Sequence, residues 1–352
     1  MSKTKNSATR PLKNSTTSFC YTIFMRHKTK RGGLVFVIVL FLVLSLGWAK
    51  RNAIYDWGRL RNYQAPSQVM QLAADTTMTT QAIHLFYVNH PTIQDKNSFN
   101  ASCPNNGGEQ TIVLGCYHAR QAGIFLYTVT DPQLNGVMQV TAAHEVLHAI
   151  YERLSSKQRN HVNKLLEDYY RNDLKDKRLL DIIEAYKKTE PSDVTNEMHS
   201  IFGTEVGKLS PDLENYYGQY FSDRARIISY SKHYEAAFTS RKSQADSILQ
   251  QVKDIEQQLS ALKTQIDTKE SDLKSKRLTI DSQRSTASDI DAYNAQVRAY
   301  NSELVQYKND IAIYNQLVAQ HNQLLAQYQQ IAVEASQLLK ELDSRSQSIS
   351  DQ

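Results

Sequence analysis

VTAAHEVLHAIYERL, residues Val140 to Leu154, is the stretch on which the interpretation of the fold depends. His144 and His148 stand four positions apart, and Glu145 directly follows the first histidine. Residues four positions apart lie on one face of an α-helix, so both imidazoles can reach one metal ion. The neighbouring residues are mostly uncharged, as a buried helix requires, because an unpaired charge is costly in an apolar interior. The stretch therefore predicts a buried metal-binding helix.

Two histidines on one helix face suit Zn²⁺, which binds imidazole nitrogen and carboxylate oxygen at about 2.0 to 2.2 Å. A catalytic zinc site has three protein ligands and leaves the fourth position to a water molecule, whose pKa falls toward about 7. A carboxylate within hydrogen-bond reach takes the proton of that water, and Glu145 is the residue assigned this catalytic role. In the alternative interpretation, hydrogen bonds in a core satisfy the histidines and no metal binds.

The motif resembles that of the zincin metallopeptidases, which carry the pattern His-Glu-x-x-His. The metzincin class is excluded, because its extended motif needs glycine and histidine where this chain has Tyr151 and Leu154. The resemblance is instead to the gluzincins, whose third ligand is a glutamate on a later helix. NEMHS, Asn196 to Ser200, is similar to the thermolysin-type segment and implies that Glu197 binds zinc. The family has aspartate after the serine, where this chain has Ile201.

Glu205 is the competing candidate for the third zinc ligand. It lies eight residues after Glu197, which on one helix means about 80° of rotation and about 12 Å of rise, so both cannot bind the same ion. Glu197 is favoured because its neighbours resemble the motif and because Gly203 would bend or loosen the helix before Glu205. His199 is turned by about 200° from Glu197 and is an alternative outer contact or oxyanion donor.

The positive charge of the chain is concentrated at its beginning. The 352 residues include 41 Lys and Arg against 36 Asp and Glu, a net charge of +5. Residues 1–33 contain eight of these bases and no acid. A nucleic-acid groove needs basic residues clustered on the folded part, and the pattern indicates none. No nucleic-acid partner is therefore expected.

An uncharged segment, GGLVFVIVLFLVLSLGWA, follows the basic tail at residues 32–49. As a helix it would be roughly 27 Å long, close to the bilayer core of about 30 Å. The segment predicts a single-pass transmembrane helix. The positive-inside rule then places residues 1–31 in the cytoplasm and everything after the helix on the extracytoplasmic side of the cell membrane. Alternatively, Gly47 and Ala49 fit a signal-peptide cleavage site.

The three cysteines and five further histidines are interpreted from their surroundings. Cys103 and Cys116 lie beyond the predicted membrane helix, and we expect them to form a disulfide rather than two free thiols. Cys20 falls on the predicted cytoplasmic side. Five histidines are isolated in the sequence and are interpreted as surface or packing residues: His84, His90, His118, His161 and His199.

The pattern between residues 50 and 240 indicates a small sheet followed by helices. Residues 50–66 form a predicted linker, and residues 67–240 a zincin-like domain. Three runs rich in aromatic and β-branched residues predict strands: Ala82 to His90, Thr111 to His118 and Gly123 to Thr130. The segments downstream have a helical period, so the substrate cleft is expected between the sheet half and the helical half.

From about Arg241 the apolar residues follow a heptad pattern, interrupted only by the polar stretch of residues 282–289. Sustained heptads predict a coiled coil. An antiparallel hairpin over residues 241–345 is the simplest arrangement, with a parallel multimer as the alternative, and residues 346–352 are a predicted disordered tail. One set of tyrosines recurs at multiples of seven and is interpreted as seam residues: Tyr293, Tyr300, Tyr307, Tyr314 and Tyr328.

Together these patterns predict an α+β protein with an N-terminal transmembrane helix, a zincin-like domain and a C-terminal coiled-coil hairpin. Its predicted function is that of a zinc-dependent endopeptidase, which hydrolyses protein or peptide substrates outside the cytoplasm. The alternative is a non-catalytic membrane-anchored scaffold whose coiled coil binds a partner protein or a second copy. In a mixed case, the hairpin restricts access to the cleft or delivers a partner protein.

Overall fold

The computed structural model describes residues 50–104 and 113–344, and from the preceding segment residues 36, 39–42, 44, 45 and 47. The chain divides into two units, Met1–Gly58 and Arg59–Gln352, and each is described by itself. Helix α2 (Arg51–Leu60) begins in the first unit. All helices and strands that follow α2 belong to the second unit.

The predicted transmembrane helix at residues 32–49 is not supported. Among the residues that the structure describes, no helix is both long enough and apolar enough to span a bilayer. More than half of residues 32–49, and all of the predicted basic tail, lie outside the described residues. The prediction relied on the length and the lack of charge of the whole segment, whereas its described residues are too few to supply the roughly 20 apolar residues of a membrane span. The predicted single-pass localisation, with an extracytoplasmic domain, is withdrawn for the same reason.

Helix α2 occupies more than half of the predicted linker at residues 50–66, and the second unit is also helical where the sequence predicts its first strand. Helix α3 (Ser67–Asp75) precedes α4 (Thr80–Val88), so the predicted strand from Ala82 to His90 is wrong. The hydroxyl of Thr79 accepts a hydrogen bond of 3.4 Å from the Ala82 amide at the start of α4. Ala82, Leu85 and Phe86 then recur at helical spacing and are buried in the core. This periodicity overrides the strand preference of the aromatic and β-branched residues.

One three-stranded sheet is present in the described part of the chain, in the order β1-β3-β2. Strand β1 (Thr92–Gln94) is parallel to β3 (Gly123–Tyr127), and β2 (Gly115–His118) is antiparallel to β3. Helix α5 (Lys96–Ser102) follows β1, and the disulfide between Cys103 and Cys116 joins its end to β2. With strands this short, the predicted α+β fold is corrected to a mainly helical one.

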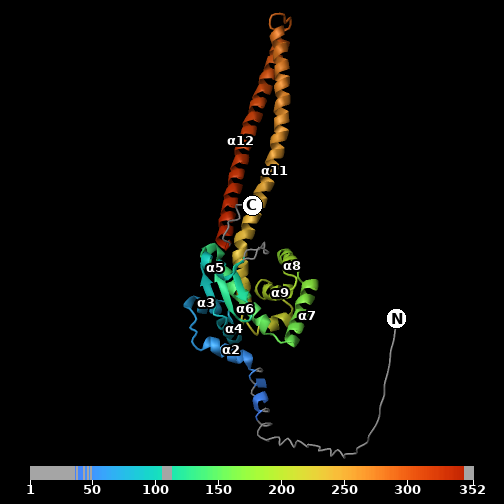
Figure 1. Ribbon diagram of the computed structural model, residues 1–352. Coiled ribbons are helices and arrows are strands. Elements are labelled where there is room, and N and C mark those ends of the chain that lie inside the picture. Colours follow the sequence, from blue (N-terminus) through green and yellow to red (C-terminus); the bar gives the residue numbers. More distant parts are fainter. Residues whose placement is uncertain are drawn as a thin grey trace, which may run out of the picture. The chain divides into compact units, whose positions relative to one another are not determined.

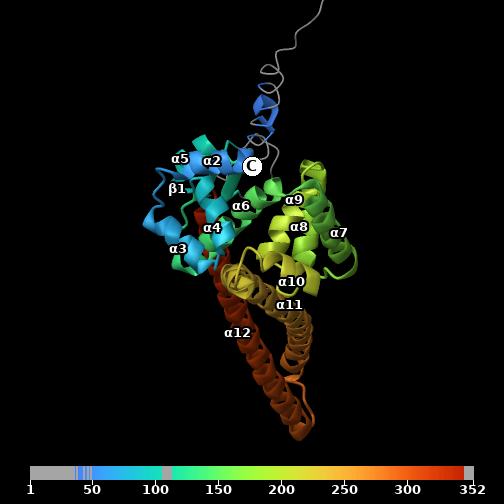
Figure 2. The ribbon, with the colours of Figure 1, turned by 90° about the horizontal axis from the view of Figure 1, so that it is seen from below.

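Helix α6 (Val137–Arg153) is central to the core. It follows the 3-10 helix η1 (Pro132–Leu134), and Figure 2 shows it between α3 and α4 on one side and the group α7 to α10 on the other. That group consists of α7 (Ser156–Asn172), α8 (Lys177–Thr189), α9 (Val194–Thr204) and α10 (Pro211–Tyr217). Gly203 allows α9 to approach α6 closely, because a Cβ there would clash with Leu147.

The two heptad segments form long helices, α11 (Arg224–Gln283) and α12 (Ile290–Leu342), which lie side by side as a hairpin (Figure 1). One end of the hairpin has an apolar core that includes Ile248, Val252, Ile255 and Leu324. Nearer the turn, Lys269 pairs with Asp310 and Lys276 with Glu303, each at 2.6 Å. The five heptad tyrosines of α12 are half-buried. Helix α11 begins 17 residues before the predicted start of the coiled coil and is continuous with the core.

Candidate metal centre

Helix α6 presents His144 and His148 side by side. The two rings are 4.8 Å apart between centroids and inclined at 70°. The helix begins after Gly136, whose positive φ of 104° places it in the left-handed region that glycine favours. A side chain at this position would also lie 2.7 Å from the carbonyl oxygen of Tyr230 on α11. The start of the helix, and hence the position of its histidines, is held by this close contact.

Glu197, in the first turn of α9, completes a group of three potential ligands. Its Oε2 lies 3.6 Å from Nε2 of His144, and its Oε1 lies 3.6 Å from Nε2 of His148. One ligand atom from each residue lies within 4.8 Å of the other two. Two atoms bound tetrahedrally to zinc at about 2.1 Å are about 3.4 Å apart. The spacing of the three side chains therefore fits one zinc ion.

The charge of Glu197 also suits a metal ligand. The residue is 8% exposed, and its buried Oε2 has no hydrogen-bond partner within the described part of the chain. Burial by itself raises the pKa of this carboxyl, but the nearby imidazoles of His148 and His144 lower it, and the net shift is downward. An ionised, buried carboxylate beside two imidazoles is the environment that a bound cation would complete.

Glu145 is buried beside the edge strand β2. It is 5% exposed, and a Cβ placed on Gly115 would lie 2.7 Å from its Oε1. Glycine at the start of β2 thus leaves the room that the Glu145 side chain occupies. Sequence reasoning did not single out Gly115, because its importance depends on a helix 30 residues later.

Glu205 does not join the two histidines. Helix α9 ends at Thr204, and the Glu205 carboxylate accepts a hydrogen bond of 2.7 Å from Arg178 on α8. The same guanidinium pairs with Glu235 on α11 at 2.7 Å. Glu205 therefore links three helices, and in the structure Glu197 is the glutamate beside the histidines.

His199 is fully buried in an aromatic cluster. Its Nε2 lies 2.8 Å from the Tyr216 hydroxyl, and its ring packs near Tyr151 and Tyr217. Burial, together with the nearby His148 and His144, holds the pKa of His199 well below its usual range. Since His199 is 0% exposed, it is placed for packing in the core rather than for contact with a ligand in the cleft.

The other isolated histidines lie on four different elements or loops. His90 stacks on Tyr63 with ring centroids 4.3 Å apart, and its Nε2 lies 2.9 Å from the Arg59 carbonyl oxygen. His84 on α4 and His161 on α7 are both exposed. His118, on β2, lies close to both disulfide cysteines, which its position in the sequence did not indicate.

A cleft of about 820 Å³ contains the three potential ligands and Glu145. Residues 113–119, which include β2, form one wall, and residues of α8 and α9 line another part. Tyr186 and Asp193 were not identified from the sequence. Burial raises the pKa of Asp193, and the neighbouring Glu197 carboxylate adds to the shift. Most charged residues of the lining are acidic: Glu145, Glu152, Glu190, Asp193, Glu197 and Glu205, with Arg159 as a cation.

Comparison with known proteins returns no relatives. No protein-family model matches the chain, and neither a curated protein nor a solved structure matches it significantly. The resemblance to zincins consequently rests on the motif and on the arrangement of His144, His148, Glu145 and Glu197.

Proposed function

We propose that the protein is a zinc-dependent endopeptidase. His144, His148 and Glu197 would hold the ion, which when bound supplies an acidified water and polarises the scissile carbonyl. Glu145 acts as general base: its carboxylate accepts a proton from the attacking water and passes it to the leaving amine nitrogen. Its place one residue after His144, in the wall of the same cleft, supports this role.

The observation that carries the proposal is the position of Glu197. It comes from a different helix, 49 residues after His148, and both carboxylate oxygens face the histidines. A core built only for packing has no use for a buried carboxylate, because desolvating its oxygen atoms is costly. A bound zinc ion would compensate that cost.

An extended peptide is the substrate form that the cleft favours. Tyr127 on β3 donates its N–H to the Leu114 carbonyl at 2.8 Å. Because backbone groups alternate in an antiparallel ladder, those of Gly115 and Tyr117 are directed to the opposite, open edge of β2. A peptide pairing with that edge would pass beside Glu145 and would gain backbone hydrogen bonds whatever its sequence.

The test compares zinc content and peptide hydrolysis in the full-length chain and two variants. We expect about one zinc per chain in the wild type, measured by elemental mass spectrometry on protein prepared without reductant. Glu145→Gln should keep that zinc and lower the turnover of a quenched fluorescent peptide library by about 10² to 10⁴-fold. Glu197→Ala should lose both zinc and turnover.

Glu167→Gln is the matched control, because this glutamate is exposed on α7 and its side chain is 51% accessible. It should leave both quantities unchanged. Full turnover in a zinc-loaded Glu145→Gln variant would overturn the proposed mechanism. A folded wild type that binds no zinc would overturn the proposed metal site itself.

The second candidate is a non-catalytic scaffold, and the hairpin is the feature that favours it. Helix α11 has 60 residues, a length of about 90 Å, and little of it contacts the cleft. Leu278 and Ile290, near the turn, are 65% and 70% exposed. A scaffold would bind a partner protein or a second copy equally well with and without zinc. Unchanged partner binding in Glu197→Ala, with no hydrolysis by the wild type, would favour this function.

A further inference from the structure

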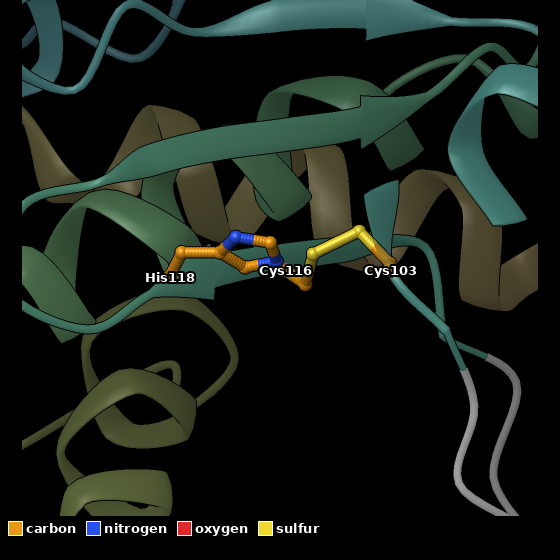
Figure 3. A group of neighbouring side chains, drawn as sticks. All are labelled: Cys103, Cys116 and His118. Atoms are coloured by element: carbon orange, nitrogen blue, oxygen red, sulfur yellow. A yellow bond between two sulfur atoms is a disulfide. The ribbon is translucent and has the colours of Figure 1, made fainter. Parts of the chain in front are cut away.

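A second group of potential metal ligands lies on β2, apart from His144, His148 and Glu197. Figure 3 shows the disulfide between Cys103 and Cys116 with the His118 imidazole beside it. Cys103 is the C-cap of α5, whereas Cys116 and His118 stand two positions apart on the strand. Side chains at this spacing lie on one face of a strand, so the strand itself pairs Cys116 with His118.

The intervening residues of β2 face the opposite way. The Tyr117 hydroxyl donates a hydrogen bond of 2.5 Å to Glu152 on α6, and Gly115 lies against Glu145. The face with Cys116 and His118 therefore points away from α6. Cys116 and His118 thus belong to the opposite face of β2 from the one that meets α6, and both groups of potential ligands line the same cleft.

The geometry of this second group suits a thiophilic ion. Both Sγ atoms and one His118 ring nitrogen lie within 4.8 Å of one another. Zinc bonds of about 2.3 Å to sulfur and 2.0 to 2.1 Å to nitrogen would place these atoms about 3.5 to 3.8 Å apart. The Cα atoms of the cysteines are already 6.2 Å apart, so opening the disulfide needs side-chain rotation more than backbone movement.

The His118 ring is held in place and its nitrogens are uncommitted. It packs against Phe125 on β3 with ring centroids 4.8 Å apart. Within the described residues neither ring nitrogen makes a hydrogen bond, and the side chain is half-buried. An imidazole fixed by an aromatic neighbour, with a nitrogen beside two sulfurs, needs little reorganisation to become a ligand.

We propose that reduction of the disulfide converts Cys103, Cys116 and His118 into a second zinc site. Two molecules of a low-molecular-weight thiol break the Cys103–Cys116 bond and leave as one oxidised disulfide, giving two cysteine thiols. Zn²⁺ then displaces one proton from each thiol and binds two thiolates and the His118 imidazole, with water in the fourth position. The disulfide and the bound metal ion are thus two alternative cross-links between α5 and β2.

The proposed site is chemically distinct from the one that serves hydrolysis. Thiolate ligands select zinc and other thiophilic ions, whereas His144, His148 and Glu197 offer only nitrogen and oxygen. Cobalt(II) bound by thiolates gives an intense near-ultraviolet charge-transfer absorption that a site without sulfur does not produce. Metal binding at the two sites can therefore be measured separately, and the absence of metal from one site does not decide whether the other binds it.

The experiment uses the full-length chain carrying Cys20→Ser, which removes the only other cysteine. Cobalt(II) is titrated into oxidised and reduced protein without oxygen. We expect the thiolate band in the reduced protein alone, and one more zinc per chain after reduction by elemental mass spectrometry. Glu197→Ala should leave the band unchanged. His118→Ala should weaken binding by about tenfold or more, while His161→Ala, on exposed α7, should not.

A second measurement tests the proposal even if reduction of the disulfide unfolds part of the chain. The disulfide is equilibrated against a series of glutathione ratios with and without zinc. Zinc that binds the reduced form at about ten times its Kd lowers the reductant needed for half-reduction about tenfold. His118→Ala should abolish most of that shift. A midpoint that zinc does not move, or reduced protein without a thiolate band, overturns the proposal.

Discussion

The hydroxyl of Ser344, two residues beyond the end of α12, donates a hydrogen bond of 2.5 Å to the carbonyl of Val113, two residues before β2. The Asn100 side chain on α5 donates to the Ser344 carbonyl, also at 2.5 Å. Leu338 and Leu342 of the same helix end pack with Leu134 and Val137. The end of α12 is thus attached to the segment that leads into β2, which forms a wall of the cleft.

Leu338→Ala should destabilise this attachment. Leu338 is 2% exposed, and a buried leucine replaced by alanine typically lowers the free energy of unfolding by about 2 to 5 kcal/mol. Its neighbour Leu339 is 41% exposed, so Leu339→Ala should change the unfolding free energy by less than about 0.5 kcal/mol. Urea denaturation followed by circular dichroism measures both variants. Equal losses would show that the α12 end is not docked as described.

Glu197→Ala and Glu205→Gln should separate metal binding from stability. Glu197→Ala removes one of the three proposed zinc ligands, so zinc content should fall to near zero. Glu205→Gln removes a carboxylate that pairs with Arg178, which retains Glu235 as a partner. It should keep its zinc and show only a small loss of thermal stability. Loss of zinc from Glu205→Gln with Glu197 intact would reverse the assignment of the two glutamates.

Gly115→Ala should impair hydrolysis without removing the metal. The added Cβ would lie 2.7 Å from Glu145 Oε1 and 2.5 Å from Thr141 Cγ2, so the general base must shift. A misplaced base should lower turnover by about 10²-fold or more, at unchanged zinc content. Gly207→Ala is the control, because its nearest neighbour is the flexible Lys232 side chain at 3.6 Å. Equal turnover in both variants and the wild type would contradict the close fit of Gly115 and Glu145.

The ion pair of Glu214 with Arg224 should make stability depend on acidic pH. Burial raises the pKa of Glu214, but hydrogen bonds from Arg224 and from the Leu209 amide lower it, and the net shift is downward from 4.5. A carboxyl with a lowered pKa in the folded state contributes stability above its unfolded value, and this contribution is lost as the pH falls through the folded value.

Thermal unfolding between pH 7 and pH 3 measures this contribution. Glu214→Gln should be less stable than the wild type at pH 7, and the difference should shrink below about pH 4.5. Glu270→Gln, at an exposed position of α11, is the comparison for general charge effects. A difference that stays constant over the whole range would exclude the ionised pair as its source.

Local periodicity was enough to identify the helix that carries His144 and His148 and the two long helices. Spacing of four places His144 and His148 on one face of any helix, and heptads specify helices without reference to the rest of the chain. The disulfide between Cys103 and Cys116 was also expected and is present, although the membrane helix on which that expectation was based is not supported. These features depend on neighbours within a few turns or one loop.

The features that the sequence left open or that were predicted wrongly depend on distant partners. The segment Thr80–Val88 is a helix because its buried face meets α6, and a short apolar run by itself does not distinguish helix from strand. Which of Glu197 and Glu205 lies beside the two histidines depends on where α9 ends and on the pairing of Glu205 with Arg178 on α8. His118 is isolated in the sequence, but β2 and the end of α5 place it beside the two cysteine sulfurs. Residue types and local spacing thus show which side chains could bind a metal or transfer a proton. Long-range packing decides which of these side chains come into contact, because each contact depends on several helices and strands burying their apolar faces together.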